Sequence, residues 1–336
     1  WGNSKDGGSN APAGKGYTKI YSTHGAFAAL KADGSITVWG SSKHGGSNAP
    51  AGTGYTKIYS TEQAFAALKA DGSITVWGNS DRGGSGAPTD SGYTKIYSTG
   101  YAFAAFKADG SIVAWGEPYN GGSGAPTDSG YTKIYSNQYA FVALKADGSI
   151  VAWGGPYNGG KGAPSGTGYT KIYSTAYAFA VIETDGSITA WGSPDKGGTA
   201  PSGTGYTKIY SNNIAFAALK TDGSITAWGE LYHGSTGAPS DSGYTKIYST
   251  SSAFAAVKTD GSITAWGSSD FGGSTTGFGI TQSATTLSVD EDSTNTYTIV
   301  LDKQPIGDVT VSMLSDSIGS STSVATVTPS LTFTNG

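Results

Sequence analysis

Residues 55–78 read YTKIYSTEQAFAALKADGSITVWG, and this stretch decides the fold because close copies of it recur along the chain. Each copy ends in a Trp-Gly pair, and the pairs lie 38 residues apart with one interval of 37. The tryptophans are Trp1, Trp39, Trp77, Trp115, Trp153, Trp191, Trp228 and Trp266. Such a period indicates an array of small supersecondary units. Since one unit cannot bury its own apolar face, neighbouring copies must cover one another.

One copy divides into short strands. Residues 55–60 alternate and are rich in β-branched and aromatic types, which predicts a strand, and the mostly apolar residues 64–69 suit a buried second strand. Asp71-Gly72 predicts a two-residue hairpin turn with positive φ, and residues 74–77 form the third strand. Past Gly83-Gly84, the Ala87-Pro88 pair suggests a loop and a short fourth strand at the edge of the sheet. Four short antiparallel strands describe a propeller blade.

The number of copies predicts seven blades. The first strand begins at Tyr17, Tyr55, Tyr93, Tyr131, Tyr169, Tyr206 and Tyr244. The chain opens inside a repeat, so the segment through Ala11-Pro12 lacks a preceding third strand, while the last copy lacks the Ala-Pro pair. We therefore expect an all-β, seven-bladed β-propeller over residues 1–277, closed by the N-terminal strand, which would remove exposed sheet edges. A linear solenoid is the alternative.

The repeat resembles that of the regulator-of-chromosome-condensation propellers, through residues 66–72 (AALKADG), Trp77-Gly78 and Gly83-Gly84. Its short length is most similar to the bacterial β-lactamase inhibitor proteins of that fold. The resemblance covers residues 1 to about 277 and implies the architecture. Gly84 stands where the family usually has Gln, and the His that often precedes the second strand is absent. The resemblance therefore carries over neither β-lactamase inhibition nor nucleotide exchange on a small GTPase.

Residues 278–336 have a different composition, rich in Thr, Ser and Val. The alternating stretches 286–289, 296–301, 308–312 and 324–327 predict strands of a small β-sandwich. The segment resembles the Calx-β-like or immunoglobulin-like modules of large bacterial surface proteins, and it is short of a last strand. Another segment or another subunit would complete it. The acidic run Asp290, Glu291 and Asp292 is a candidate Ca²⁺ site, with a solvated turn as the alternative.

Composition argues against several functional classes. The net charge is −4 and there is no basic run, so a nucleic-acid partner is not expected, and no apolar stretch approaches the length of a membrane span. The chain has no cysteine, hence no disulfide and no thiolate metal site. With three histidines and no nucleophile elbow, it shows no catalytic constellation, so we expect no enzyme and, apart from Ca²⁺ in the tail, no cofactor.

The copies differ where function is expected. The Asp-Gly-Ser turn occurs in all seven, whereas the loops between the first and second strands, and those after the third, change nearly every time. Strand parity places both variable loops at one end of the blades, and loops on a rigid scaffold commonly carry binding. Free drift of these loops is the alternative. The candidate ligand-binding residues are His24, Glu62, Tyr101, Tyr119, Tyr139, Tyr157, Tyr177, Ile214, Tyr232, His233 and Phe271.

Together these features predict a non-catalytic, extracellular or cell-surface bacterial repeat protein that binds a protein or glycan through its variable loops. The chain begins with Trp in mid-repeat, so we expect it to be an excerpt of a longer chain or a matured fragment. One alternative is a structural subunit of a surface filament, surface layer or adhesin stalk, self-associating by strand exchange through the incomplete tail module. A sugar-binding lectin is another.

Overall fold

The computed structural model describes residues 3–273, 280–282, 299–301, 309–311 and 331–333. The chain divides into two compact units, Trp1–Ser274 and Thr275–Gly336.

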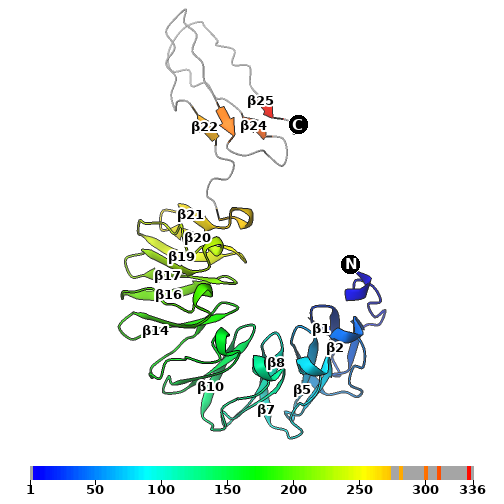
Figure 1. The fold of residues 1–336 in the computed structure, drawn as a ribbon. Helices are drawn as coiled ribbons and strands as arrows, with labels where there is room; N and C mark the ends of the chain where they lie inside the picture. Colours follow the sequence, from blue (N-terminus) through cyan, green and yellow to red (C-terminus); the bar gives the residue numbers. More distant parts are fainter. Residues whose placement is uncertain (1–2, 274–279, 283–298, 302–308, 312–330, 334–336) are drawn as a thin grey trace, which may run out of the picture. The chain divides into compact units, whose positions relative to one another are not determined.

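Seven antiparallel sheets of three strands each make up the first unit, in the order in which they occur along the chain (Figure 1). They are β1 (Tyr17–Ser22), β2 (Ala26–Lys31) and β3 (Ile36–Gly40); β4 (Tyr55–Ser60), β5 (Ala64–Lys69) and β6 (Ile74–Gly78); β7 (Tyr93–Ser98), β8 (Ala102–Lys107) and β9 (Ile112–Gly116); β10 (Tyr131–Ser136), β11 (Ala140–Lys145) and β12 (Ile150–Gly154); β13 (Tyr173–Ser174), β14 (Ala178–Ile182) and β15 (Ile188–Gly192); β16 (Tyr206–Ser211), β17 (Ala215–Lys220) and β18 (Ile225–Gly229); and β19 (Tyr244–Ser249), β20 (Ala253–Lys258) and β21 (Ile263–Gly267). The predicted all-β class with seven repeated sheets is confirmed, and these sheets fit a propeller-type array.

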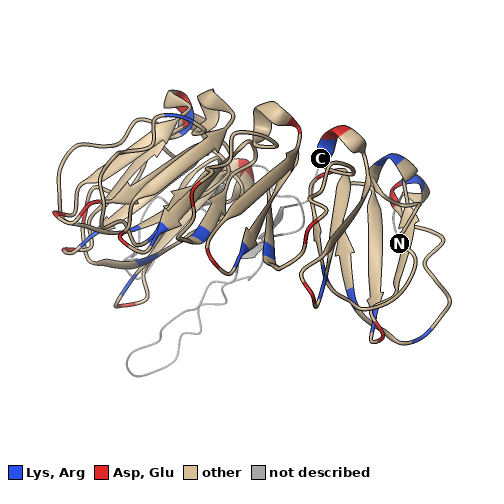
Figure 2. Cartoon of the chain, turned by 90° about the horizontal axis from the view of Figure 1, so that it is seen from below, with Lys and Arg blue, Asp and Glu red and all other residues tan. Residues whose placement is uncertain are grey.

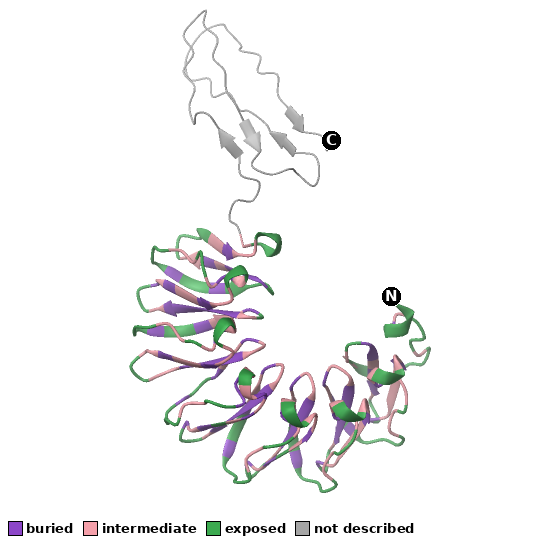
Figure 3. Ribbon diagram, viewed as in Figure 1, coloured by how far each residue is buried: buried purple, intermediate pink, exposed green. Residues whose placement is uncertain are grey.

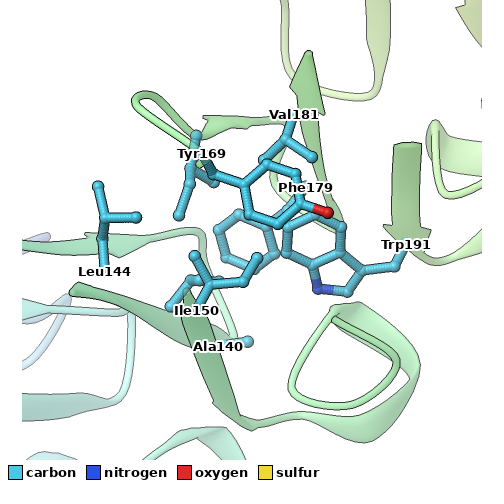
Figure 4. Packing of buried hydrophobic residues seen from close by; sticks show 9 residues of the cluster. Ala140, Leu144, Ile150, Tyr169, Phe179, Val181 and Trp191 are labelled. Carbon is cyan, nitrogen blue, oxygen red and sulfur yellow. The ribbon is translucent and has the colours of Figure 1, made fainter. Parts of the chain in front are cut away.

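The core of the unit lies between successive sheets, because the middle strand presents apolar side chains to both of its faces. In the fifth sheet, Phe179, Val181 and Trp191 point to the fourth sheet, where they meet Ala140 and Leu144 (Figure 4). Along each middle strand, alternate residues therefore face the preceding and the following sheet. Figure 3 shows the buried positions concentrated within the sheets and the exposed ones in the turns. Every internal sheet depends on two neighbours, as in other repeat arrays.

A 3₁₀ turn follows each third strand, and one more precedes the first sheet. All of them except the last pack on the sheet that comes next in the sequence. The turns are η1 (Ser4–Asp6), η2 (Ser42–His44), η3 (Ser80–Arg82), η4 (Pro118–Asn120), η5 (Pro156–Asn158), η6 (Pro194–Lys196), η7 (Leu231–His233) and η8 (Ser269–Phe271). After η2, the carbonyl of Gly45 accepts a hydrogen bond of 3.0 Å from Nε1 of Trp77 in the next sheet. The prediction of a fourth strand was wrong for the described residues, since this turn and a segment of irregular chain take its place.

The N-terminal segment also lies elsewhere than predicted. Instead of completing the seventh sheet, its turn η1 packs on the first: Nε1 of Trp39 donates to the carbonyl of Gly7 at 3.1 Å. The segment obeys the same rule as every other turn, which covers the sheet that follows it in sequence. The two end sheets do not cover one another, because the side chains of Ile20 and Ile263 are each 63% exposed. Ring closure by the N-terminal strand is therefore not the arrangement in this structure.

The Asp-Gly turns differ from the prediction in one detail. Only Gly72 has a positive φ, of 79°, and Asp71 does not. The amide of Gly72 donates to the carbonyl of Lys69, while Lys69 itself pairs with Ser73, so Ala70, Asp71 and Gly72 form a three-residue loop. Such a loop needs one left-handed residue, which glycine supplies.

The second unit contains two described strand pairs. β22 (Ile280–Gln282) runs antiparallel to β23 (Ile299–Leu301), and β24 (Val309–Val311) runs antiparallel to β25 (Leu331–Phe333). The predicted calcium ligands Asp290, Glu291 and Asp292 lie outside the described residues.

Candidate functional site: a rim of variable turns

The two sets of variable loops share one edge of the sheets, as strand parity predicts. The hydroxyl of Thr61, between the first two strands of its sheet, donates to the carbonyl of Arg82 in the turn η3 of the same repeat, at 3.0 Å. Equivalent hydrogen bonds recur in the other sheets, with Asn137 and Asn212 as donors in two of them. At the opposite edge, the Asp-Gly turn binds the start of the next sheet, as the amide of Gly54 donates to the carbonyl of Asp33. Figure 2 shows the 3₁₀ turns gathered along one edge, which we call the rim.

Backbone hydrogen bonds join the rim loops of successive sheets. The amide of His24 donates to the carbonyl of Glu62, and the amide of Glu62 donates to the carbonyl of Gly100, at 2.8 and 3.0 Å. The same relation links Gly100 to Gln138, Ala176 to Asn213, and Asn213 to Ser251. These bonds use main-chain atoms alone, so the side chains at these positions are free to vary. The rim is thus a fixed backbone that carries changeable residues.

Three of the predicted tyrosines form one column on the rim. The ring centroids of Tyr101 and Tyr139 are 5.5 Å apart with an interplanar angle of 26°, and those of Tyr139 and Tyr177 are 5.3 Å apart at 29°. The three come from the third, fourth and fifth sheets, and all are half-buried. Offset stacking at these separations stabilises aromatic pairs. We call this group the tyrosine column.

A cation lies over each end of the tyrosine column. The guanidinium carbon of Arg82 is 4.2 Å from the ring centroid of Tyr101, and Nζ of Lys196 is 3.8 Å from that of Tyr177. Both cations come from 3₁₀ turns. Because the faces of an aromatic ring are electron-rich, the two contacts are attractive. Sequence reasoning missed Arg82 and Lys196; the signal was a basic residue directly before the turn glycine, in the repeat that precedes that of Tyr101 and in the repeat of Tyr177 itself.

Tyr139 lies at the centre of the column, between the rings of Tyr101 and Tyr177. Burial raises the pKa of Tyr139 well above its ordinary value, and the neighbouring hydroxyls of Tyr177 and Tyr101 raise it further. The phenol therefore stays neutral throughout the physiological range. A group of this kind suits packing and hydrogen bonding, not proton transfer.

A second set of predicted aromatic residues is exposed. Tyr119 in η4 is 51% exposed, Tyr157 in η5 is 77% exposed and Tyr232 in η7 is 78% exposed. In η4 and η5 the tyrosine stands between proline and asparagine, so two neighbouring sheets present the same Pro-Tyr-Asn turn. Phe271 in η8 is also exposed, at 52%. The structure thus separates the tyrosine column from these outward-facing rings.

A cleft of about 540 Å³ adjoins one end of the tyrosine column. It lies between the turns η3 and η4, and Arg82, Glu117 and Gln63 contribute polar groups to its lining. The carboxylate of Glu117 accepts a hydrogen bond from the amide of Asn120 at 2.8 Å, which holds the turn η4 that bears Tyr119. The cleft offers both signs of charge, and its Arg82 also contacts the ring of Tyr101.

The remaining predicted residues are spread along the rim. His24 is exposed, with its ring centroid 6.4 Å from that of His44. Glu62 accepts a hydrogen bond of 3.0 Å from Nε2 of Gln138, two sheets away, because the intervening position is Gly100. Ile214 is half-buried. Nδ1 of His233 lies 2.6 Å from Oε2 of Glu230, which is three residues earlier in the sequence. None of these residues joins the tyrosine column.

Among the residues that the structure describes, no group of three or more His, Cys, Asp or Glu side chains could hold a metal ion. The described part of the chain contains no helix whose length and apolar character would let it cross a membrane.

Comparisons with known proteins identify similar folds only. No family model and no curated protein matches the chain. The ectodomain of the receptor kinase CR4 from Physcomitrella patens is 17% identical, with 76% of this chain and 71% of that chain covered and a TM-score of 0.42. The ectodomain of ACR4 from Arabidopsis thaliana is 21% identical, with coverages of 72% and 90% and a TM-score of 0.41. Prp20p from Saccharomyces cerevisiae is 14% identical, with coverages of 63% and 72% and a TM-score of 0.40. Similarity at this level fixes neither an activity nor a partner.

Proposed function

We propose that this protein is a non-catalytic binding scaffold, located outside a bacterial cell or on its surface, that holds a protein or glycan on its rim. The observation that carries the proposal is the exposure of Tyr119, Tyr157 and Tyr232, three large amphipathic rings on turns of one edge. Exposed tyrosines of this kind contribute strongly to contacts with proteins and stack on sugar rings. The extracellular location is supported by composition alone, through the absence of cysteine and the low charge.

The scaffold supports the proposal through its rigidity. The turn that bears Tyr157 is fixed from inside by Asn137, whose Nδ2 donates to the carbonyl of Asn158 at 2.7 Å. Its glycine, Gly159, lies against Phe179 of the next sheet. A ring presented on so constrained a turn loses little backbone freedom on binding, which favours affinity.

The two Pro-Tyr-Asn turns provide the test. The full chain is applied to a glycan array and to a panel of purified extracellular proteins, together with the double variant Tyr119→Ala/Tyr157→Ala. We expect binding on one of the two platforms, and an affinity at least tenfold lower for the double variant. Loss of two exposed aromatic contacts of about 1–2 kcal/mol each produces a change of this size.

The same two sheets offer a matched control. Val113 in β9 and Val151 in β12 are 39% and 38% exposed and lie on strands instead of rim turns. The variant Val113→Ala/Val151→Ala therefore removes exposed apolar surface from the same sheets without touching η4 or η5, and it should bind as the parent does. Equal binding by both double variants, or no binding on either platform, would refute the proposal.

A further inference from the structure

The two ends of the array carry the two halves of one interface. At every internal junction, alanines and a larger aliphatic residue of one sheet meet a Tyr, an Ile, a Phe and a Trp of the next. Between the first and second sheets, Ala26, Ala28 and Leu30 contact Tyr55, Ile58, Phe65, Ala67 and Trp77. Six such clusters recur along the unit.

The seventh sheet presents the first half of this interface, and none of the core clusters among the described residues includes this outward face. Ala253, Ala255 and Val257 of β20 occupy the positions of Ala26, Ala28 and Leu30. Beside them, Tyr248 is 54% exposed and Ile263 is 63% exposed. Their counterparts in internal sheets are covered; Ile188, for example, is 6% exposed. We call this surface the trailing face.

The first sheet presents the second half. Its outward residues Tyr17, Ile20, Phe27 and Trp39 occupy the positions of Tyr55, Ile58, Phe65 and Trp77. Ile20 is 63% exposed, whereas Ile58 is 1% exposed. We call this surface the leading face. The exposed apolar side chains are thus Ile20 at one end and Tyr248 and Ile263 at the other, whereas Trp39 and Ala253 stay buried. Exposed apolar surface of this kind marks sites of association.

Polar groups at the two ends also match. Along the rim, the amide of one loop donates a hydrogen bond to the carbonyl of the loop in the next sheet. At the two ends of the unit, the described backbone hydrogen bonds include none from the amide of Ser251 and none to the carbonyl of His24. At the opposite edge, Asp260 and Gly16 occupy the positions of Asp33 and Gly54, which are joined by a hydrogen bond of 3.0 Å. Each end thus supplies one donor and one acceptor: the amide of Ser251 and the carbonyl of Asp260 at one end match the carbonyl of His24 and the amide of Gly16 at the other.

We infer that the trailing face of one chain binds the leading face of a second copy of this chain, so that copies associate head to tail by extending the junction that already joins its sheets. A heterologous contact of this type does not close a dimer and leaves one free face of each kind for the next copy. The inference is independent of ligand binding on the rim, because Tyr119 and Tyr157 belong to neither face.

The N-terminal turn limits this association. η1 occupies, on Trp39 and Phe27, the place that a turn of a preceding sheet would take: a Cβ on Gly7 would lie 2.6 Å from Phe27. The equivalent turn at the trailing face is η8, followed by Gly272. Head-to-tail contact therefore requires η8 of one copy to replace η1 of the other, and the N-terminal segment acts as a partial cap, as terminal segments of repeat arrays commonly do.

The experiment measures the oligomeric state of the full chain by sedimentation velocity over a hundredfold concentration range. We expect species larger than the monomer, whose size increases with protein concentration. In a variant that lacks residues 1–10, the same association should occur at concentrations at least tenfold lower. Ile20→Lys and Ile263→Lys should each be monomeric alone, because each loses one face. Val113→Lys, which changes an exposed valine outside both faces, should associate as the parent does.

Mixing the two single variants gives the sharpest result. Ile20→Lys retains the trailing face and Ile263→Lys retains the leading face, so the mixture should form a one-to-one dimer that grows no further. Far-ultraviolet circular dichroism of each variant verifies that it is folded. The inference is overturned if the parent and the N-terminally shortened variant stay monomeric at every concentration, or if the mixture of folded variants contains no dimer.

Discussion

The rings of Tyr139 and Tyr177 stack at a centroid distance of 5.3 Å although the two residues are 38 positions apart in the sequence. They occupy the same position of successive repeats. Because successive repeats form neighbouring sheets, side chains at equivalent positions lie next to one another. The column this creates ends in Arg82 and Lys196. At this position of the repeat, identical residues in neighbouring sheets are therefore in direct contact.

Tyr139 is the residue of the column that should contribute most to stability, since it stacks on both neighbours. Tyr139→Ala removes two aromatic contacts of about 0.5–1.5 kcal/mol each, together with half-buried apolar area, so we expect a loss of about 2 kcal/mol in the free energy of unfolding. Tyr139→Phe keeps the ring and should change stability far less. Thermal and urea unfolding of both variants measures the difference. Tyr157→Ala, on an exposed ring, is the control and should stay within about 0.5 kcal/mol of the parent.

Gly121 should tolerate no side chain, because the turn η4 is pressed against the next sheet. Its φ is 103°, and a Cβ there would lie 2.6 Å from Cδ2 of Phe141. Gly130 is the matched control: its φ is 86°, but nothing lies within 4 Å of its Cβ position. Gly130→Ala should cost about 1–2 kcal/mol, the strain of a left-handed alanine. Gly121→Ala should cost clearly more, since strain and overpacking add. Equal losses in urea unfolding would argue against the close packing.

Much of the fold could be predicted from the sequence because its signals are local. The strands at 55–60 and 64–69 have the predicted bounds, since alternation and flanking turn residues act within a few positions. The partner of the N-terminal segment could not be predicted, because the sequence makes it equivalent to every other turn and leaves open which sheet it covers. The packing of Gly7 on Phe27 decides this.

The sequence predicted where the candidate site lies, but it did not predict what each of its residues contacts. Variation among repeats identified both sets of rim loops, and it predicted Tyr101 and Tyr157 alike as ligand-binding residues. The structure separates them because the loops between first and second strands are joined by backbone hydrogen bonds and bring their side chains into contact. The 3₁₀ turns instead direct Tyr157 outward, at 77% exposure. A residue pattern contains no information on which of two adjacent loops lies closer to its copy in the next repeat.

Acid should destabilise the array through its Asp-Gly turns. In each turn the backbone amide and hydroxyl of the following serine bind the carboxylate, as Ser73 does at Asp71 with distances of 2.9 and 2.7 Å, and these hydrogen bonds hold the carboxyl pKa below its ordinary value. The carboxylates concerned are Asp33, Asp71, Asp109, Asp147, Asp185, Asp222 and Asp260.

The direction of this pH dependence follows from the linkage between proton binding and folding. A pKa that is lower in the folded state gives stability that is complete above the unfolded value, near 3.8, and is lost as the pH falls through the folded value. The melting temperature should therefore be flat between pH 8 and pH 5 and should fall steeply below about pH 4. Replacing the seven aspartates by asparagine keeps a side-chain acceptor that does not ionise, so this variant should show a shallower decline. An identical decline in both proteins would assign the acid sensitivity elsewhere.

The fifth sheet contains a local defect, and it differs from the other six sheets at the residue directly after its middle strand. Residues 169–174 have the same sequence as the other first strands, yet only Tyr173–Ser174 pairs as a strand, and a cavity of about 310 Å³ opens beside it. In the other six sheets the facing residue is a lysine whose ammonium lies over the strand's first tyrosine, as Lys145 lies 5.0 Å from the ring of Tyr131. Here the residue is Glu183, which accepts a hydrogen bond of 3.1 Å from the hydroxyl of Tyr169; burial and this contact raise the pKa of Tyr169 to about 12.

Glu183→Lys should repair the pairing of residues 169–172 with β14, because it restores the contact between an ammonium and the ring of Tyr169 that the other sheets possess. A contact between a solvent-exposed cation and an aromatic ring contributes about 0.5–1 kcal/mol, so a small rise in stability is expected. The more telling measurement is hydrogen exchange: amides of residues 170–172 should exchange at least tenfold more slowly in Glu183→Lys than in the parent. Glu183→Gln removes the charge without supplying a cation and should leave exchange near the parental rate. Similar protection in Glu183→Gln would mean that the negative charge alone opens the strand, and no change in either variant would place the cause outside position 183.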